Sequence, residues 1–172
     1  LHACLDWLPG QHGEPAQPVV LMGHSLGAAA ALLAGSQRSD VAAIVSVSAF
    51  AHPEQVMRRW LAEYRIPFWP LGWLVNRYIE RVIGQRFDDI APVSRIAHIQ
   101  APVLLVHGQD DTVVPLECAQ RLQASAPHAS LLVRAGRHDG FDEEDALYAQ
   151  VSDWLDRNVP AAPPACAPRP QP

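Results

Sequence analysis

Residues 19–33 read VVLMGHSLGAAAALL, and this stretch decides the fold that the rest of the chain must fit. The run VVLM is short, apolar and partly β-branched, which is typical of a strand buried on both faces of a parallel sheet. The following LGAAAALLAG is helix-prone and ends at Gly35. Gly23 and Gly27 permit a sharp turn that holds Ser25 at the helix N-terminus, where free N–H groups favour negative charge. Ser25 is therefore a candidate nucleophile.

Strands and helices alternate along most of the chain. The expected strands cover 19–23, 41–50, 102–108 and 130–136, and the expected helices cover 26–37, 115–126 and 143–158. We expect Asp142 to cap the last helix. The alternation predicts an α/β fold, with a parallel sheet of about four strands in a core made of residues 1–50 and 99–158.

Two segments interrupt the alternation. Residues 51–98 are helical and aromatic-rich, and they are too long for a simple crossover, so they predict a cap or lid with a hinge at PFWPLG. Phe68, Trp69 and Trp73 in this cap either wall an apolar substrate pocket, which we favour, or form an exposed patch that touches a membrane surface or a partner. Residues 159–172 are rich in proline and alanine and predict a disordered tail.

The bulk composition narrows the function classes. The 172 residues carry a net charge of −5 with no basic cluster, which argues against a nucleic-acid partner. Three widely spaced cysteines form neither a disulfide framework nor a zinc site, and the acidic residues of 139–145 are explained by a helix N-terminus rather than by a metal. No run is long and apolar enough for a transmembrane helix, and residues 1–18 show no signal peptide. We therefore expect a cytoplasmic globular protein without a cofactor.

Candidate partners for Ser25 follow two later strands. Reactive groups in parallel sheets collect beyond the carboxyl ends of the strands. The stretch HGQDDTVVP after the third strand offers Asp110 and Asp111, and AGRHDGF after the fourth offers His138. A serine, a carboxylate and a histidine on three such loops are what nucleophilic acyl transfer requires. His24 and His107 are interpreted as residues that pack these loops.

Together, GHSLGAAAA, PVLLVHGQDDTVVP and GRHDGF resemble the nucleophile elbow, acid loop and histidine loop of the α/β-hydrolase superfamily. The most similar group contains the capped esterases, the monoacylglycerol lipases and the serine-aminopeptidase-like enzymes. The resemblance covers residues 1–158, with the cap matched least. Within the H-G-x-x-D-x-x-V-P pattern it assigns the carboxylate to Asp111 rather than Asp110.

The resemblance also implies the roles of the elbow residues. Gly23, His24 and Gly27 would form the elbow, and the backbone N–H of Leu26 would donate to an oxyanion. A second donor, which the superfamily takes from a loop after an early strand, has no match before Gly23.

The superfamily sheet has eight strands, and the four found here resemble the last four. The chain also begins with leucine in what reads as the end of a helix, so we expect it to lack the N-terminal half of its parent. The strand at 19–23 would then present an open apolar edge. We expect the segment alone to be poorly stable and weakly active.

The predicted activity is hydrolysis of carboxylic esters, with thioesters or amides as alternatives, through an acyl-enzyme on Ser25. His138 would be the general base and Asp111 its orienting partner. The implied partner is a small-molecule substrate with an apolar acyl group, and no cofactor is implied. The alternative is a non-catalytic domain of the same fold, or an inactive fragment, that acts as an interaction module.

Overall fold

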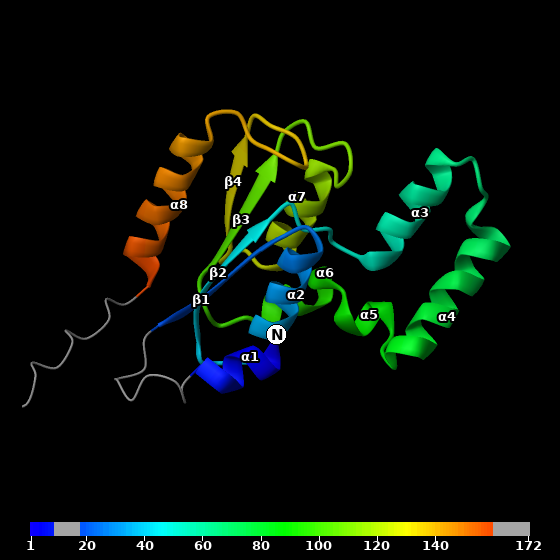
Figure 1. Cartoon of the computed structure of the whole chain (residues 1–172), viewed down its shortest axis with the longest axis horizontal. Coiled ribbons are helices and arrows are strands. Elements are labelled where there is room, and N and C mark those ends of the chain that lie inside the picture. The colour runs from blue at the N-terminus through cyan, green and yellow to red at the C-terminus, as the bar shows by residue number, and fades with distance from the viewer. Residues whose placement is uncertain (9–17, 160–172) are drawn as a thin grey trace, which may run out of the picture.

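A computed structural model describes residues 1–8 and 18–159 (Figure 1). Its centre is a parallel sheet of four strands, as the alternation predicts, and the strand order in the sheet is β1-β2-β3-β4. The strands are β1 (Val19–His24), β2 (Val41–Val47), β3 (Val103–Gly108) and β4 (Ser130–Arg134). Because β1 is at one end of this order, its outer edge has no partner strand in the described part of the chain, which confirms the predicted open edge. Met22 on this strand is 58% exposed.

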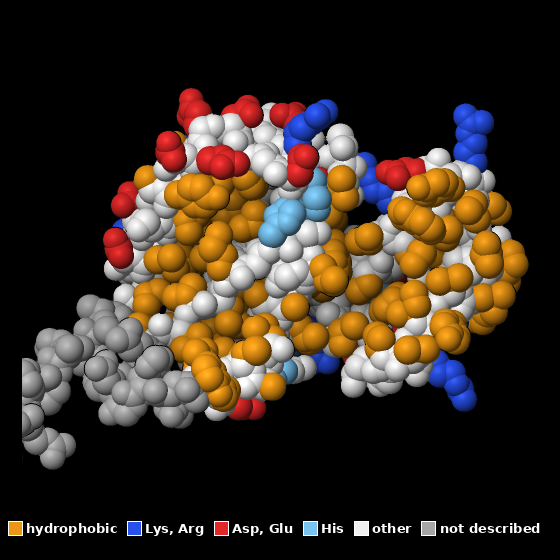
Figure 2. Space-filling model, in the orientation of Figure 1, with side chains coloured by type: hydrophobic (Ala, Val, Ile, Leu, Met, Phe, Trp, Pro, Cys, Tyr) orange, Lys and Arg blue, Asp and Glu red, His pale blue; other side chains and the backbone are white. Residues whose placement is uncertain are grey.

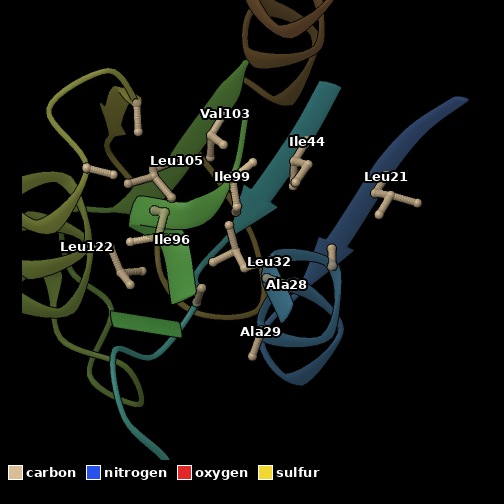
Figure 3. Packing of buried hydrophobic residues seen from close by; sticks show 14 of the residues in the cluster. Leu21, Ala28, Ala29, Leu32, Ile44, Ile96, Ile99, Val103, Leu105 and Leu122 are labelled. Carbon is tan, nitrogen blue, oxygen red and sulfur yellow. The ribbon is translucent and has the colours of Figure 1, made fainter. Parts of the chain in front are cut away.

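Helices cover both faces of the sheet. On one face lie α1 (His2–Trp7), α2 (Leu26–Gly35), α6 (Pro92–Arg95), the short turn η3 (Ile96–His98) and α7 (Leu116–Ser125). Figure 3 shows part of this cluster, in which helix and turn residues meet strand residues: Leu32, Ile96 and Leu122 with Ile44, Val103 and Leu105. The other face is covered by α8 (Glu144–Asn158), whose apolar side chains pack on β2 and β3: Leu147, Val151 and Trp154.

The alanine-rich sequence of α2 allows this helix to lie close to the sheet. Ala28, Ala31 and Ala34 are almost fully buried against the strands. A Cβ atom on Gly35 would lie 2.2 Å from the Cδ1 atom of Ile44, so the last turn of the helix has little spare room. Close approach of α2 to β1 and β2 keeps the start of the helix, and with it Ser25, at the carboxyl edge of the sheet.

The predicted cap is a group of helices that projects from the sheet (Figure 1). It contains α3 (Pro53–Glu63), the π-helical turn η2 (Phe68–Gly72), α4 (Trp73–Ile83) and α5 (Phe87–Ile90). The PFWPLG stretch, for which a hinge is predicted, contains η2, where the backbone is kinked at Trp69. Residues 92–98, which the prediction placed in the cap, pack instead into the core, where Ile96 is fully buried. We call residues 53–90 the projecting segment.

Some predicted details are wrong. The second strand ends at Val47 rather than at residue 50, because Ser48 turns the chain with a φ of 51°. Asp142 does not cap α8: the residue before the helix is Glu143, with a φ of 55° and no capping side-chain bond. The backbone N–H of Asp142 is held by the carbonyl of Ala135 instead. Of the predicted tail at 159–172, all but Val159 lies outside the described residues.

Candidate active site

Ser25 lies where β1 ends and α2 begins, in a strained backbone conformation. Its φ is 54° and its ψ is −113°, a combination that costs a non-glycine residue about 1–3 kcal/mol. Two backbone hydrogen bonds hold it there: its N–H donates to the carbonyl of Val47 at 2.8 Å, and its carbonyl accepts from the N–H of Ala29 at 3.1 Å. The Ser25 hydroxyl makes no capping bond to the helix, so it is available to other side chains.

The two glycines of the elbow differ in what they contribute. A Cβ atom on Gly23 would lie 2.3 Å from the backbone carbon and oxygen of Gly27 and 2.7 Å from the nitrogen of Ala28. A Cβ atom on Gly27 would meet no atom of the described chain within 4 Å. The turn therefore needs the missing side chain at Gly23, whereas the expectation that Gly27 is needed for the same reason is wrong.

A chain of two hydrogen bonds joins Ser25 to His138 and Asp111. The Nε2 atom of His138 is 3.1 Å from the Oγ atom of Ser25, and its Nδ1 atom is 2.8 Å from the Oδ2 atom of Asp111. His138 lies between β4 and α8, and Asp111 lies after β3, so three strand ends supply the three groups. Asp110, the alternative carboxylate, is exposed and does not contact His138 through its side chain.

The loop that carries Asp111 is held by its own backbone. The Oδ1 atom of Asp111 accepts hydrogen bonds from the N–H groups of Val113 and Val114 at 2.9 and 2.8 Å. Burial raises the pKa of the Asp111 carboxyl, but the hydrogen bonds from His138 and from these N–H groups outweigh it and lower the pKa below its usual value. Because a carboxylate only accepts, Nδ1 of His138 carries a proton, and in the neutral imidazole Nε2 is then the acceptor that faces Ser25.

His107 and His24 position these loops, as interpreted from the sequence. The Nε2–H of His107, which is buried, donates to the carbonyl of Val114 at 2.8 Å and so ties the acid loop to β3. The Nε2–H of His24 donates to the backbone carbonyl of His138 at 2.6 Å, and the two rings lie 4.8 Å apart. His24 therefore holds His138, and His107 holds the loop that carries Asp111, each through a backbone carbonyl.

The N-terminus of α2 supplies N–H groups beside Ser25. Leu26 is the first residue of this helix, and the first N–H groups of a helix have no partner four residues earlier. Leu26 is also mostly exposed. This placement suits an oxyanion donor.

Phe68, Trp69 and Trp73 do not line the apolar cavity beside the acid loop, and Trp73 lines a different, more polar cavity, so their role in a substrate pocket stays a prediction. The guanidinium of Arg58 covers the ring of Phe68 at 3.6 Å, and the rings of Trp69 and Trp73 pack on each other at 5.4 Å. Trp69 is 67% exposed, because the turn at η2 directs it outward. The apolar cavity beside the acid loop is lined by residues of α3 and α7 instead, and sequence spacing carried no signal for them.

Two further observations concern metals and membranes. Residues 1–8 and 18–159 contain no cluster of three or more histidine, cysteine or acidic side chains arranged to hold a metal ion. Within the same residues, every helix is too short or too polar to cross a bilayer.

Comparison with known proteins gives one family and several similar structures. Residues 2–160 match the model of the prolyl oligopeptidase family. The chain is 36% identical over 121 residues to the uncharacterized protein YqkD of Bacillus subtilis, which covers 67% of this chain and 40% of YqkD. It thus spans about two-fifths of the length of the curated relatives it matches.

Among solved structures, the esterase domain of a Rhodothermus marinus protein has a TM-score of 0.67 at 23% identity and covers 93% of this chain and 68% of that one. A puromycin-hydrolyzing peptidase of Mycobacterium tuberculosis has a TM-score of 0.67 at 19% identity and covers 94% of this chain and 25% of that one. These likenesses show a shared α/β fold.

Proposed function

Since the chain belongs to the prolyl oligopeptidase family, within the α/β-hydrolase superfamily, we propose that it carries the nucleophile, base and acid of a serine hydrolase. Its substrates are carboxylic esters, with thioesters and amides as alternatives. Ser25 is the nucleophile, His138 the general base and then the general acid, and Asp111 the partner that orients His138. One observation carries the proposal: the unbroken hydrogen-bond chain from the Ser25 hydroxyl through His138 to a buried carboxylate.

Acylation begins when the Ser25 hydroxyl attacks the ester carbonyl. The oxygen–carbon bond forms as the hydroxyl proton passes to Nε2 of His138, and the carbonyl electron pair moves onto oxygen. The backbone N–H of Leu26 donates to this oxyanion, and the positive N-terminus of α2 adds to its stabilisation. The bond to the alcohol then breaks, and His138 gives its proton to the leaving oxygen.

Deacylation repeats the sequence with water. His138 takes a proton from water, the resulting hydroxide attacks the acyl carbon, and the proton returns to Ser25 Oγ as the acid leaves. Asp111 keeps its charge throughout, which its lowered pKa favours, and stabilises the imidazolium that forms twice per turnover. No step calls on a metal or a cofactor.

Esters are the first substrate class because an alkoxide leaves more readily than an amine. Amides stay in the proposal because solved structures similar to this chain include a peptidase as well as an esterase domain. We propose that the projecting segment, residues 53–90, acts as the lid over the bound acyl group, since it follows β2, whose end holds the N–H of Ser25.

The test is reaction of the full-length protein with a fluorophosphonate probe, followed by peptide mapping. We expect the label on Ser25 and its loss in Ser25→Ala and His138→Ala. Ser36→Ala is the matched control, because Ser36 follows the other end of the same helix and its hydroxyl donates to the carbonyl of Leu33. It should label like the unmodified protein.

Ester hydrolysis gives the quantitative readout. Ser25→Ala should lower kcat on the order of 10⁶-fold, as loss of the nucleophile does in other serine hydrolases. Absence of any label, with the protein folded, would contradict the proposal and favour a non-catalytic interaction domain.

A further inference from the structure

A cavity of about 240 Å³ lies between α3 and α7. Figure 2 shows the surface hollowed between the sheet-bearing body and the projecting segment, with basic and acidic side chains at the rim. The walls are apolar and come from three places, namely Phe50 after β2, Val56 of α3, and the acid loop with Val113, Val114 and Pro115.

This cavity adjoins the proposed catalytic groups. Val113 and Val114 line it while their N–H groups donate to Asp111. Phe50 lies three residues beyond Val47, whose carbonyl holds the N–H of Ser25. The cavity therefore belongs to the same edge of the sheet as the nucleophile, and its size suits a short chain rather than a large ring system.

Its polar side chains are mostly donors. Arg59 from α3 and Arg121 from α7 both line the cavity, and neither has a carboxylate within 4 Å in residues 1–8 and 18–159. The neighbouring Arg58, by contrast, is paired with Glu54 at 2.6 Å. Two like charges that face one cavity from separate helices repel each other, and a bound anion would remove that repulsion.

The remaining polar groups fit the same pattern. The Cys118 thiol donates to the Oε1 atom of Gln55 at 4.0 Å. No described residue accepts a hydrogen bond from the amide nitrogen of Gln55, so this N–H group can donate to a ligand. Burial raises the pKa of the Cys118 thiol, so it stays a neutral donor. Glu117 is the one acidic side chain in the lining, against two arginines.

We propose that this cavity selects substrates in which the scissile ester is joined by a short apolar arm to a carboxylate, which Arg59, Arg121 and Gln55 bind. The inference rests on the proposed function, because the ester itself is cleaved at Ser25. A carboxylate only accepts hydrogen bonds, so it matches a donor-rich pocket, and a bond to a charged group discriminates well against an uncharged analogue. The apolar arm would contact Phe50, Val56 and the acid loop.

The test compares the rates at which the full-length protein hydrolyses two esters. One is the para-nitrophenyl monoester of glutarate, and the other is its uncharged isostere, in which an isopropyl group replaces the carboxylate. We expect a higher kcat/KM for the charged ester, and a preference that declines as salt screens the arginines. Arg59→Gln and Arg121→Gln should each reduce the ratio of the two kcat/KM values about tenfold.

Two variants sharpen this test. Arg58→Gln is the matched control, since it alters the adjacent arginine on the same helix, whose guanidinium lies on Phe68 instead of in the cavity. It should leave the ratio unchanged. Glu117→Gln removes the opposing charge from the lining and should raise the ratio. An unchanged ratio in both cavity arginine variants, or no preference for the charged ester, would overturn the inference.

Binding to Ser25→Ala protein separates this inference from the proposed hydrolysis. Calorimetry with the charged ester should show binding that Arg59→Gln or Arg121→Gln weakens about tenfold in the same background. If the protein hydrolyses neither ester but retains this arginine-dependent binding, the result supports the carboxylate-binding site and contradicts the hydrolase proposal. If it hydrolyses both esters equally, the result supports the hydrolase proposal and contradicts the carboxylate-binding site.

Discussion

In β2 and β3 the side chains of Ile44, Val45 and Leu105 are at most 1% exposed, whereas in α3 and α4 the side chains of Trp60 and Tyr78 are 53% and 69% exposed. The strands are covered by helices on both faces. The projecting segment instead presents its large apolar side chains outward, as the orange surface on that side of Figure 2 shows. The two regions therefore depend on different forces.

Burial of apolar surface stabilises the sheet, and the loops at the strand ends are anchored to this rigid sheet. The projecting segment relies more on local pairs, such as Arg77 with Glu80 at 2.8 Å and the N–H of Phe87 with the same Glu80 side chain at 2.8 Å. These pairs are only partly buried, and ion pairs near the surface contribute little each. The groups that we propose for chemistry are thus on the rigid region, and the segment that we propose as a lid is on the region with fewer buried contacts.

The largest effect should come from the edge of the sheet. Asp111→Asn leaves acceptors for the loop but permits the wrong tautomer of His138, so we expect kcat for ester hydrolysis to fall about 10⁴-fold. Asp110→Asn is the matched control one residue away and should keep nearly full activity. An equal loss in the Asp110 variant would show that the exposed carboxylate, not the buried one, serves His138.

The next largest effect should be on the free energy of unfolding. We expect it for a substitution in the core around the sheet but not for one in the projecting segment. Leu32→Ala removes a fully buried side chain from the core and should lower the free energy of unfolding by about 2–5 kcal/mol. Tyr78→Ala, in the exposed face of α4, should change it by no more than about 0.5 kcal/mol. Chemical denaturation of the full-length protein measures both. A large loss for Tyr78→Ala would break the contrast, since it would mean that another part of the protein covers α4.

The elbow offers a smaller contrast within one motif. Gly23→Ala places a methyl group against the backbone of Gly27 and should destabilise the fold by about 1–3 kcal/mol. Gly27→Ala meets open space and improves helix propensity, so it should be neutral or stabilising by up to about 1 kcal/mol. Thermal unfolding of the two variants and of the unmodified protein measures both changes in stability. Equal destabilisation would argue that the turn depends on both glycines.

The smallest effect is the dependence of stability on pH. The pKa of Asp111 is lower in the folded chain than its usual value, so its contribution is complete above the unfolded pKa of about 3.9 and declines as pH falls through the folded value. Between about pH 5 and pH 2, the unmodified protein should therefore lose stability more steeply than Asp111→Asn. Identical slopes for the two proteins would contradict the stabilising role of the bond to His138.

The sheet could be predicted because its signals are local. Apolar runs such as VVLM and VLLV show strands without reference to distant residues, and the rule for parallel sheets brings the loops after them to one edge. The same rule indicated Ser25, His138 and the pair Asp110 and Asp111 on three separate loops, and the family resemblance selected Asp111 from the pair. The structure brings Ser25, His138 and Asp111 within hydrogen-bond distance of one another. Their catalytic role stays a prediction.

The features that were missed depend on contacts between elements. Arg59 and Arg121 are far apart in the sequence and share a cavity only because the fold brings residues of α3 and α7 to its walls. The aromatic residues of the projecting segment could face inward or outward with the same spacing, and the turn at η2 decided the direction of Trp69. The cap of α8 was misjudged because the backbone of Asp142 bonds to Ala135 across the histidine loop.

By itself, the sequence determined the α/β class, a parallel sheet of about four strands, and the three loops that carry the proposed nucleophile, acid and base. These features follow from hydrophobic periodicity, from composition and from the chirality of the chain. Each of these is determined by residues that are close together in the sequence. Only the tertiary structure decided which glycine the elbow cannot replace and which side chains line the cavity. Those outcomes depend on distances between elements, and such distances are set when side chains from remote segments pack together.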